Sequence, residues 1–155
     1  MKLAPVLVGG MALVVMGSQR VTKDVDFLVS HPGPRAGELM NLFYDRGFEL
    51  VSRVSEAGDV IATIDNMNVA NSRFRIDKPA SIFFYNQKID LRIDLQLDFP
   101  VPAVELLEKA TTIKIRSREL EIACPEDLLR LKKLAQAARS FAGDAQDIEF
   151  LERLS

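Results

Sequence analysis

The chain has 155 residues, 48% of them hydrophobic and 27% charged, with a formal net charge of −2. This length and composition predict one globular domain with its own core, and the near-neutral charge excludes a globally basic nucleic-acid binder. The only cysteine, Cys124, cannot form an internal disulfide and fits a reducing compartment.

The N-terminal 16 residues are apolar and carry only Lys2 as a charged residue. Pro5 and the Gly9-Gly10 pair interrupt this run. No uninterrupted apolar stretch reaches the roughly 18 residues that a membrane-spanning helix needs. We therefore expect no membrane partner and a cytoplasmic location.

The first half of the chain is expected to alternate between strands and helices. Short apolar runs predict strands over residues 4–8, 24–29 and 48–54. Apolar residues at helical spacing predict helices over residues 10–17, 35–46 and 57–67. The polar stretch 71–79 predicts a loop or a short edge strand.

The second half contains the clearest strand pattern. Residues 82–85 lead into a stretch, 89–99, in which apolar and polar residues alternate, so one face is expected to be buried and the other wet. Three aspartates share the expected wet face: Asp90, Asp94 and Asp98. A helix, a hairpin and two further helices are expected over residues 103–110, 111–123, 125–139 and 144–154, with the hairpin turn at Ser117-Arg118-Glu119.

These elements predict an α/β (α+β) fold in which helices flank a mixed β-sheet. We expect a single domain over residues 1–155. Its core would span about residues 1–110, and the hairpin and C-terminal helices would occupy about residues 111–155.

Two aspartates in the predicted strand 24–29 carry the strongest chemical signal. Residues i and i+2 of a strand point to the same face, so Asp24 and Asp26 are expected side by side. Adjacent carboxylates repel each other unless they share a cation. Upstream, the Gly9-Gly10 pair lies between a strand and a helix, where backbone N–H groups can approach a polyphosphate.

An outward-facing aspartate on a later strand would complete a set of three carboxylates. Asp24 and Asp26 could hold one or two Mg²⁺ ions, and together with the third carboxylate and a glycine-lined phosphate site they are the parts of two-metal phosphoryl or nucleotidyl transfer. Each part alone is weak evidence, because most glycine pairs are tight turns and most Asp-x-Asp pairs are solvated. The ordered combination is what favours this chemistry.

The same residues resemble a known family. Val8-Gly9-Gly10, thirteen intervening residues and Asp24-Val25-Asp26-Phe27 are similar to the signature of the nucleotidyltransferase superfamily with the DNA polymerase β-like fold. Within it, the chain resembles minimal bacterial and archaeal nucleotidyltransferases, some of which belong to toxin–antitoxin pairs. The similarity extends to C-terminal residues, namely Pro125 to Leu129, Lys132, Ala135, Asp147 and Ile148.

The resemblance implies a role for several residues. Gly9 and Gly10 would contact the nucleotide phosphates. The catalytic metal ligands would be Asp24, Asp26 and a third carboxylate, for which Asp94 is preferred over Asp90 because the sequence around Asp94 matches the family's third motif.

The resemblance also suggests further nucleotide-binding residues, which would be Arg20, Thr22 and Lys132. For Arg20 and Thr22, support of the turn is an equal alternative, and Lys132 has a simple solvated role as its alternative. Gly10 stands where many relatives have a serine, which removes one hydroxyl ligand.

The implied function is transfer of a nucleoside monophosphate from an NTP, with Mg²⁺ or Mn²⁺, onto a hydroxyl of a protein, an RNA or a small molecule. A cognate toxin or antitoxin is a candidate partner. One alternative is a degenerate domain of this fold that binds a nucleotide or a partner without catalysis. An antibiotic-modifying enzyme is a weaker alternative, because no second substrate-binding domain is evident.

Basic residues of the predicted hairpin bear on the acceptor. Lys114, Arg116 and Arg118 have the same parity, and Lys109 extends the group, so that these residues could contact RNA phosphates. A solvated strand face is the simpler interpretation. His31 follows the Asp-x-Asp strand, but its Pro-Gly surroundings favour a loop residue over a catalytic base.

Overall fold

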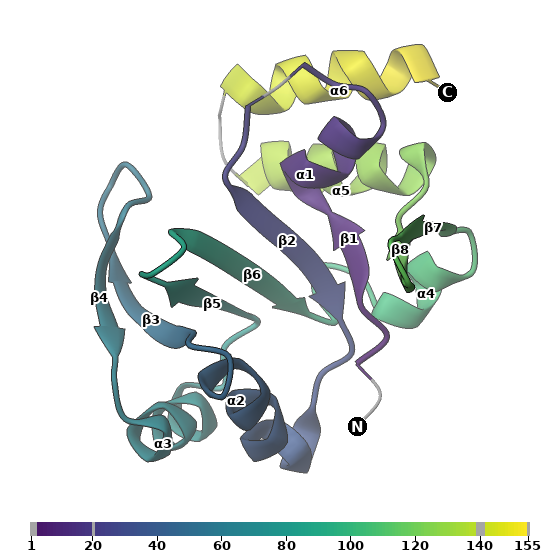
Figure 1. The fold of residues 1–155 in the computed structure, drawn as a ribbon. Coiled ribbons are helices and arrows are strands. Elements are labelled where there is room, and N and C mark those ends of the chain that lie inside the picture. Colours follow the sequence, from purple (N-terminus) through teal and green to yellow (C-terminus); the bar gives the residue numbers. More distant parts are fainter. Residues whose placement is uncertain (1–2, 20, 139–141, 155) are drawn as a thin grey trace.

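The computed structural model describes residues 3–19, 21–138 and 142–154. Within these ranges the chain forms one eight-stranded mixed sheet with the strand order β4-β3-β5-β6-β2-β1-β8-β7 (Figure 1). The strands are β1 (Val6–Val8), β2 (Asp24–Val29), β3 (Glu49–Val54), β4 (Val60–Ile64), β5 (Ser81–Asn86), β6 (Leu91–Leu97), β7 (Thr111–Ile115) and β8 (Arg118–Ile122). The expected mixed α/β fold is confirmed.

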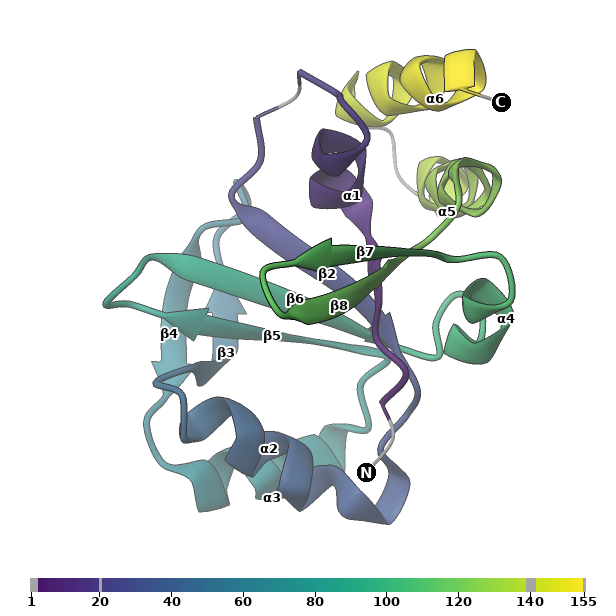
Figure 2. The same cartoon turned by 45° about the vertical axis from the view of Figure 1, so that its right-hand side comes forward.

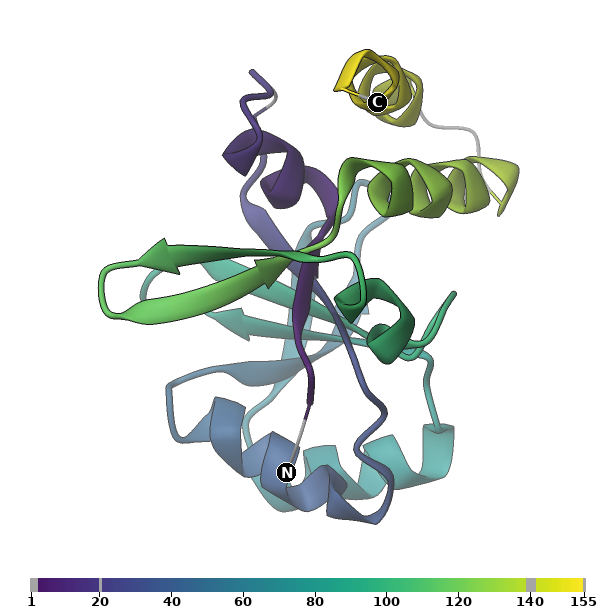
Figure 3. The same ribbon diagram turned by 90° about the vertical axis from the view of Figure 1, so that its right-hand side faces the viewer.

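Helices lie on two opposite sides of this sheet. They are α1 (Gly9–Val15), α2 (Ala36–Tyr44), α3 (Met67–Asp77), α4 (Ala103–Leu107), α5 (Pro125–Ala138) and α6 (Ala142–Leu154), with a 3-10 turn at Gly33–Arg35 before α2. In all three views α2 and α3 lie below the sheet, whereas α1, α5 and α6 lie above it (Figures 1, 2 and 3). No helix in the described ranges is long and apolar enough to cross a membrane.

Strand β2 is the centre of this arrangement. It pairs with β1 in antiparallel fashion and with β6 in parallel, and the β2–β6 register is unbroken from Asp24 to Val29. Strand β1 then pairs with β8 in parallel, which joins the β7–β8 hairpin to the sheet edge (Figure 2).

The core divides into two clusters that meet at β2. One cluster joins β1 and α1 to the C-terminal helices, and it includes Leu7, Leu13, Leu28, Leu128 and Leu151. The other joins β5 and β6 to α2 and α3, and it includes Leu39, Met40, Phe74, Phe84 and Leu95. Alternation along β2 explains the division, because Leu28 and Val29 point to opposite faces of the sheet.

Two predicted elements were wrong, and both lie between residues 57 and 79. Residues 57–67 were expected to be helical, but β-branched residues in this stretch form β4, which pairs with β3 in antiparallel fashion. Residues 71–79 were expected to be a loop or edge strand, but most of them belong to α3. The side chain of Asn66 caps this helix by accepting a hydrogen bond from the Val69 N–H at 3.1 Å.

The long alternating strand is also shorter than expected. Asp90 and Asp98 have φ angles of +50° and +49° and lie just outside the two ends of β6. Asp98 accepts hydrogen bonds from the backbone N–H groups of His31 and Ala103 at 2.9 and 2.8 Å. Asp94 is therefore the aspartate that β6 presents within its regular pairing. In the β7–β8 hairpin, Arg118 and Glu119 belong to the second strand and are not turn residues as predicted.

Candidate functional site

The pairing of β2 with β6 brings the predicted carboxylates together. Asp26 is opposite Asp94 and Asp24 is opposite Arg92 in the parallel register. Because alternate residues of a strand share a face, these four side chains form a square on one face of the sheet. Ile93 and Leu95 face the other way, toward the cluster under α2 and α3. The buried side of β6 thus fixes which residues reach the polar side.

The electrostatics of this square are unfavourable for Asp26. Burial, the neighbouring Asp94 carboxyl and then Asp24 raise the pKa of Asp26 from 3.8 to about 7, with Lys132 acting in the opposite direction. Burial also raises the pKa of Asp94, although Arg92 opposes this shift. A divalent cation bound beside these carboxyls would favour their ionised forms and so oppose the rise in pKa.

Gly9 forms a wall directly against Asp26. Its φ is +70°, and a Cβ built at this position would lie 2.2 Å from Asp26 Oδ2. A side chain is therefore excluded twice, by the backbone conformation and by the contact. Gly9 and Gly10 open α1, whose N-cap residue Val8 provides no side-chain hydrogen bond. The N–H groups of a first helical turn have no partner inside the helix and can bind a ligand.

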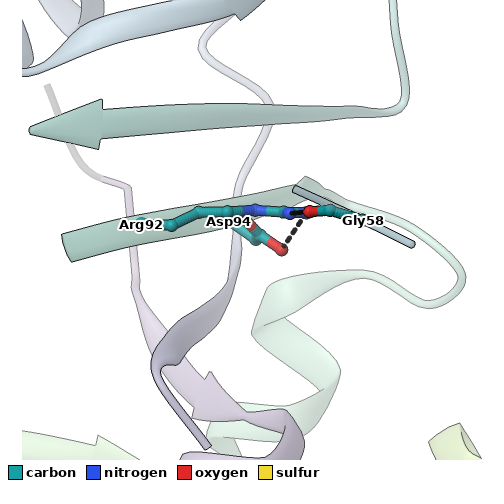
Figure 4. A network of polar contacts seen from close by, with 3 residues as sticks. All are labelled: Gly58, Arg92 and Asp94. Carbon is teal, nitrogen blue, oxygen red and sulfur yellow. Dashed lines mark hydrogen bonds and ion pairs between the residues drawn. The ribbon is translucent and has the colours of Figure 1, made fainter. Parts of the chain in front are cut away.

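Arg92 lies on the other side of the cluster formed by Asp24, Asp26 and Asp94. Its Nε and Nη2 donate to the two oxygens of Asp94 at 2.7 and 3.0 Å, and its Nη1 donates to the Gly58 carbonyl oxygen at 2.9 Å (Figure 4). The guanidinium carbon also lies 4.4 Å from the centre of the Phe83 ring. These contacts join β6 to the turn between β3 and β4.

The donor chemistry of Asp24 and Asp26 fits a hard divalent cation such as Mg²⁺. The side chains as they stand, however, include no group of three or more His, Cys, Asp or Glu within the described part of the chain that could hold a metal ion. The bidentate contact with Arg92 engages both oxygens of Asp94, the third predicted ligand. The predicted ligation by Asp24, Asp26 and Asp94 together therefore stays a prediction.

Helix α5 borders the site on the Gly9 side. A cavity of about 110 Å³ is lined by residues that include Gly9, Asp26 and Lys132. Lys132 Nζ lies 2.9 Å from Asp147 Oδ2, and the two side chains are 13% and 2% exposed. Lys132 thus lines the same cavity as Asp26 and is ion-paired to α6, and its predicted nucleotide-binding role stays a prediction.

Of the other predicted residues, Asp90 and His31 form local hydrogen bonds, and the predicted roles of Arg20 and Thr22 stay predictions. Thr22 is half-buried just before β2, and Arg20 lies outside the described residues. Asp90, the alternative third carboxylate, is in the turn between β5 and β6, where it accepts a 2.7 Å hydrogen bond from the Tyr85 hydroxyl. His31 accepts the Gly33 N–H through Nδ1 at 3.0 Å, as expected for a loop residue.

Acidic partners accompany the basic residues of the β7–β8 hairpin. Lys114 is opposite Glu119 in the antiparallel register, and Lys109 Nζ is 3.9 Å from Glu126 Oε2. Arg116 has a φ of +59° and lies in the turn. This mixed charge weakens the argument for an RNA-binding face.

A larger cavity, of about 510 Å³, lies at the β3–β4–β5 side of the sheet. Its lining includes Glu49, Thr63 and Tyr85, and Tyr85 is paired in register with Arg92 of β6. This volume is in the range of small-molecule sites. Arg92 and the three aspartates are not among the residues that line this cavity.

Sequence reasoning did not identify Arg92, although one signal was available. Arg92 and Asp94 are two residues apart in an alternating strand, which predicts that they share a face. The contact with Gly58 had no such signal, because it depends on how a distant hairpin folds toward β6.

Comparisons with known proteins bear on the fold. No family model and no curated protein sequence matches the chain. An antigenic nucleotidyltransferase-like protein from Paracoccidioides brasiliensis is similar in structure, with a TM-score of 0.56, 17% identity, and coverage of 97% of this chain and 68% of that one. The lincosamide antibiotic adenylyltransferase LnuA, in a lincomycin-bound structure, has a TM-score of 0.57, 12% identity, and coverage of 97% and 87%. The chain therefore has the nucleotidyltransferase fold.

Proposed function

We propose that this protein is a metal-dependent nucleotidyltransferase, which transfers a nucleoside monophosphate from an NTP to a hydroxyl group and releases pyrophosphate. One observation carries the proposal. Asp26 is directly opposite Asp94 in the β2–β6 register, beside Asp24, and Gly9 closes the other side of Asp26 without a side chain. The shared fold with nucleotidyltransferase-like proteins supports the same conclusion.

Each residue has a role that follows from its position. Asp24 and Asp26 would hold Mg²⁺ or Mn²⁺, which supplies positive charge to the phosphates when bound. The first-turn N–H groups of Gly9 and Gly10 would donate to phosphate oxygens. Asp94 would orient the incoming hydroxyl and accept its proton, since burial raises the pKa of this carboxyl.

Lys132 would contribute charge on the α5 side of the nucleotide. Its ammonium group lowers the pKa of Asp26 and shares the small cavity with Gly9. Because Asp147 holds this lysine by an ion pair, Lys132 would act from a fixed position. Such preorganised charge is a common source of catalysis in phosphoryl transfer.

The acceptor is proposed at the level of its chemistry, as a hydroxyl of a protein, an RNA or a small molecule. A small molecule is supported by the 510 Å³ cavity at the β3–β4–β5 side of the sheet and by the fold shared with an adenylyltransferase whose structure contains lincomycin. A cognate toxin or antitoxin remains a proposed partner, on the basis of the sequence resemblance.

Two measurements test this proposal. Calorimetric titration of Mg²⁺ with each NTP should show binding to the wild-type protein and at least a tenfold loss of affinity in Asp24→Ala and Asp26→Ala. Asp90→Asn, in the exposed β5–β6 turn, is the matched carboxylate control and should bind normally. Incubation with each α-labelled NTP and a crude RNA or protein extract should then label an acceptor. Absence of nucleotide binding to the wild-type protein would sink the proposal.

A second candidate function has its own support. Arg92 engages both oxygens of Asp94, and Asp147 engages Lys132, which suits a domain that binds a nucleotide or a partner without catalysis. Nucleotide binding without label transfer to any extract or small hydroxyl compound would favour this regulatory function.

A further inference from the structure

We propose that Arg92 permanently supplies one of the positive charges of the site, so that the protein binds one divalent cation with the nucleotide instead of two. This inference rests on the proposed nucleotidyl transfer and specifies its metal requirement. It assigns the cation position near Asp24 and Asp26 to the metal and the position near Asp94 to the guanidinium.

Arg92 is held in place by three different kinds of contact. It forms a bidentate ion pair with Asp94, donates to the Gly58 carbonyl and packs against Phe83. The side chains of Arg92 and Asp94 are only 15% and 14% exposed. An arginine anchored on three sides is a fixed part of the site, unlike a mobile surface cation, and its guanidinium stays charged at all relevant pH values.

The position of Arg92 conflicts with a second metal ion. Metals of a two-metal site lie about 3.5–4 Å apart and share carboxylate oxygens. Nε and Nη2 of Arg92 approach both oxygens of Asp94 to within 3.0 Å, so a divalent ion on Asp94 would meet a guanidinium at close range.

The charges of the site support the same count. Asp24, Asp26 and Asp94 contribute three negative charges when ionised, and Arg92 contributes one positive charge. Arg92 therefore offsets one of the three carboxylate charges before any metal binds, which lowers the need for a second divalent cation. Arg92 would then neutralise charge on the acceptor side, which is the task of the second metal in two-metal transfer.

The test counts Mn²⁺ by electron paramagnetic resonance in the ternary complex with α,β-methylene-ATP. We expect one Mn²⁺ per wild-type chain and no Mn–Mn spin coupling. Arg92→Met should bind two Mn²⁺ with a coupled, broadened spectrum, because Asp94 is released. Arg92→Lys keeps the charge and should stay at one.

Matched controls separate this inference from general damage. Arg73→Met removes an exposed arginine that pairs with Asp77 on α3, and it should leave one uncoupled Mn²⁺. Arg92→Gln is a second variant, in case Arg92→Met does not fold. Two coupled Mn²⁺ ions in the wild-type protein, or one in both Arg92→Met and Arg92→Gln, would overturn the inference.

The outcome also differs from that of the proposed function. A wild-type complex with one Mn²⁺ and a coupled pair in Arg92→Met, but without label transfer, would support the cation count and contradict catalysis. Label transfer with two coupled Mn²⁺ ions would support catalysis and contradict the cation count. No Mn²⁺ and no nucleotide binding would contradict both.

Discussion

Different kinds of structure border the two sides of the cluster formed by Asp24, Asp26 and Asp94. On one side, the Gly9 backbone lies against Asp26, and the Lys132 ion pair is buried under α6. On the other side, a single side chain, Arg92, reaches across from β6 to the backbone of Gly58 in a hairpin turn. Backbone and helix therefore border the Gly9 side, and one charged side chain borders the Arg92 side.

This difference separates what the site requires from what it can vary. On the Gly9 side, any added side chain should destabilise the fold, because neither the backbone conformation of Gly9 nor its contact with Asp26 tolerates one. On the other side, different substitutions of Arg92 change the charge and the geometry of the contact with Asp94 to different degrees. We expect substitutions on the Gly9 side to damage folding, and those on the Arg92 side to alter cation binding first.

The largest expected effect compares two glycines, one on each side. Gly9 and Gly58 have φ angles of +70° and +88°, but only at Gly9 would a Cβ meet a neighbour within 4 Å. Gly9→Ala combines backbone strain with overpacking and should reduce the free energy of unfolding by about 4 kcal/mol. Gly58→Ala should cost about 1 kcal/mol, from strain alone. Urea unfolding measures both losses of stability. Equal losses would contradict the claim that the contact with Asp26 excludes a side chain at Gly9.

The second prediction compares the two cations. Lys132→Met removes the ion pair with the 2% exposed Asp147 and should destabilise the protein by about 3 kcal/mol. Arg92→Met should also destabilise it, because it leaves three carboxylates without their guanidinium.

Added Mg²⁺ distinguishes these two losses in thermal unfolding. It should restore most of the stability of Arg92→Met, since the freed carboxylates become metal ligands. It should not restore Lys132→Met, whose damage lies at α6. Equal rescue of both variants would contradict the separation of the two sides.

The third prediction concerns pH and the metal-free protein. Because the pKa of Asp26 is about 7 in the folded state and near 3.8 when unfolded, the native state binds more protons between these values. Stability from this group is therefore fully present below about pH 4 and is lost as the pH rises through about 7, with a slope of at most about 1.4 kcal/mol per pH unit.

Asp26→Asn tests this assignment, because it removes the titrating group from the same position. Urea unfolding of the variant should show a flatter pH dependence between pH 4 and 7 than the wild type. Saturating Mg²⁺ should flatten the wild-type profile as well, by favouring the ionised carboxyl. An unchanged profile in Asp26→Asn would assign the pH dependence to other groups.

The sequence predicted more of the Gly9 side of the site than of the Arg92 side. The glycine pair and the Asp-x-Asp strand are local patterns, and their spacing indicates which side chains share a face, whereas Lys132 came from the family resemblance. The partner of Asp26 needed the β2–β6 register, which local patterns do not contain. Gly58 was out of reach because residues 57–67 were predicted to be helical, so the hairpin that carries Gly58 was missed.

The two missed elements have a common physical cause. In β4, apolar spacing fits a helix as well as a strand, and pairing with β3 decides the outcome. In α3, few residues are buried and the polar composition hides the helix, so the Asn66 cap was its best local signal. The fold class survived both errors, because it depends on the central strands and their flanking helices.

The smallest expected effect is that of Asp90→Asn, which tests whether Asp90 belongs to the Arg92 side of the site. Asp90 has a φ of +50°, lies in an exposed turn and accepts the Tyr85 hydroxyl. Asparagine tolerates this conformation and keeps an acceptor oxygen, so Asp90→Asn should change the free energy of unfolding by less than about 0.5 kcal/mol. Asp94→Asn removes a charge that holds Arg92, so it should lower stability more and change Mn²⁺ binding. If Asp90→Asn instead changed Mn²⁺ binding as much as Asp94→Asn, the third carboxylate would have to be reassigned to the β5–β6 turn, because register alone would then be a poor guide to which aspartate joins Asp24 and Asp26 in the site.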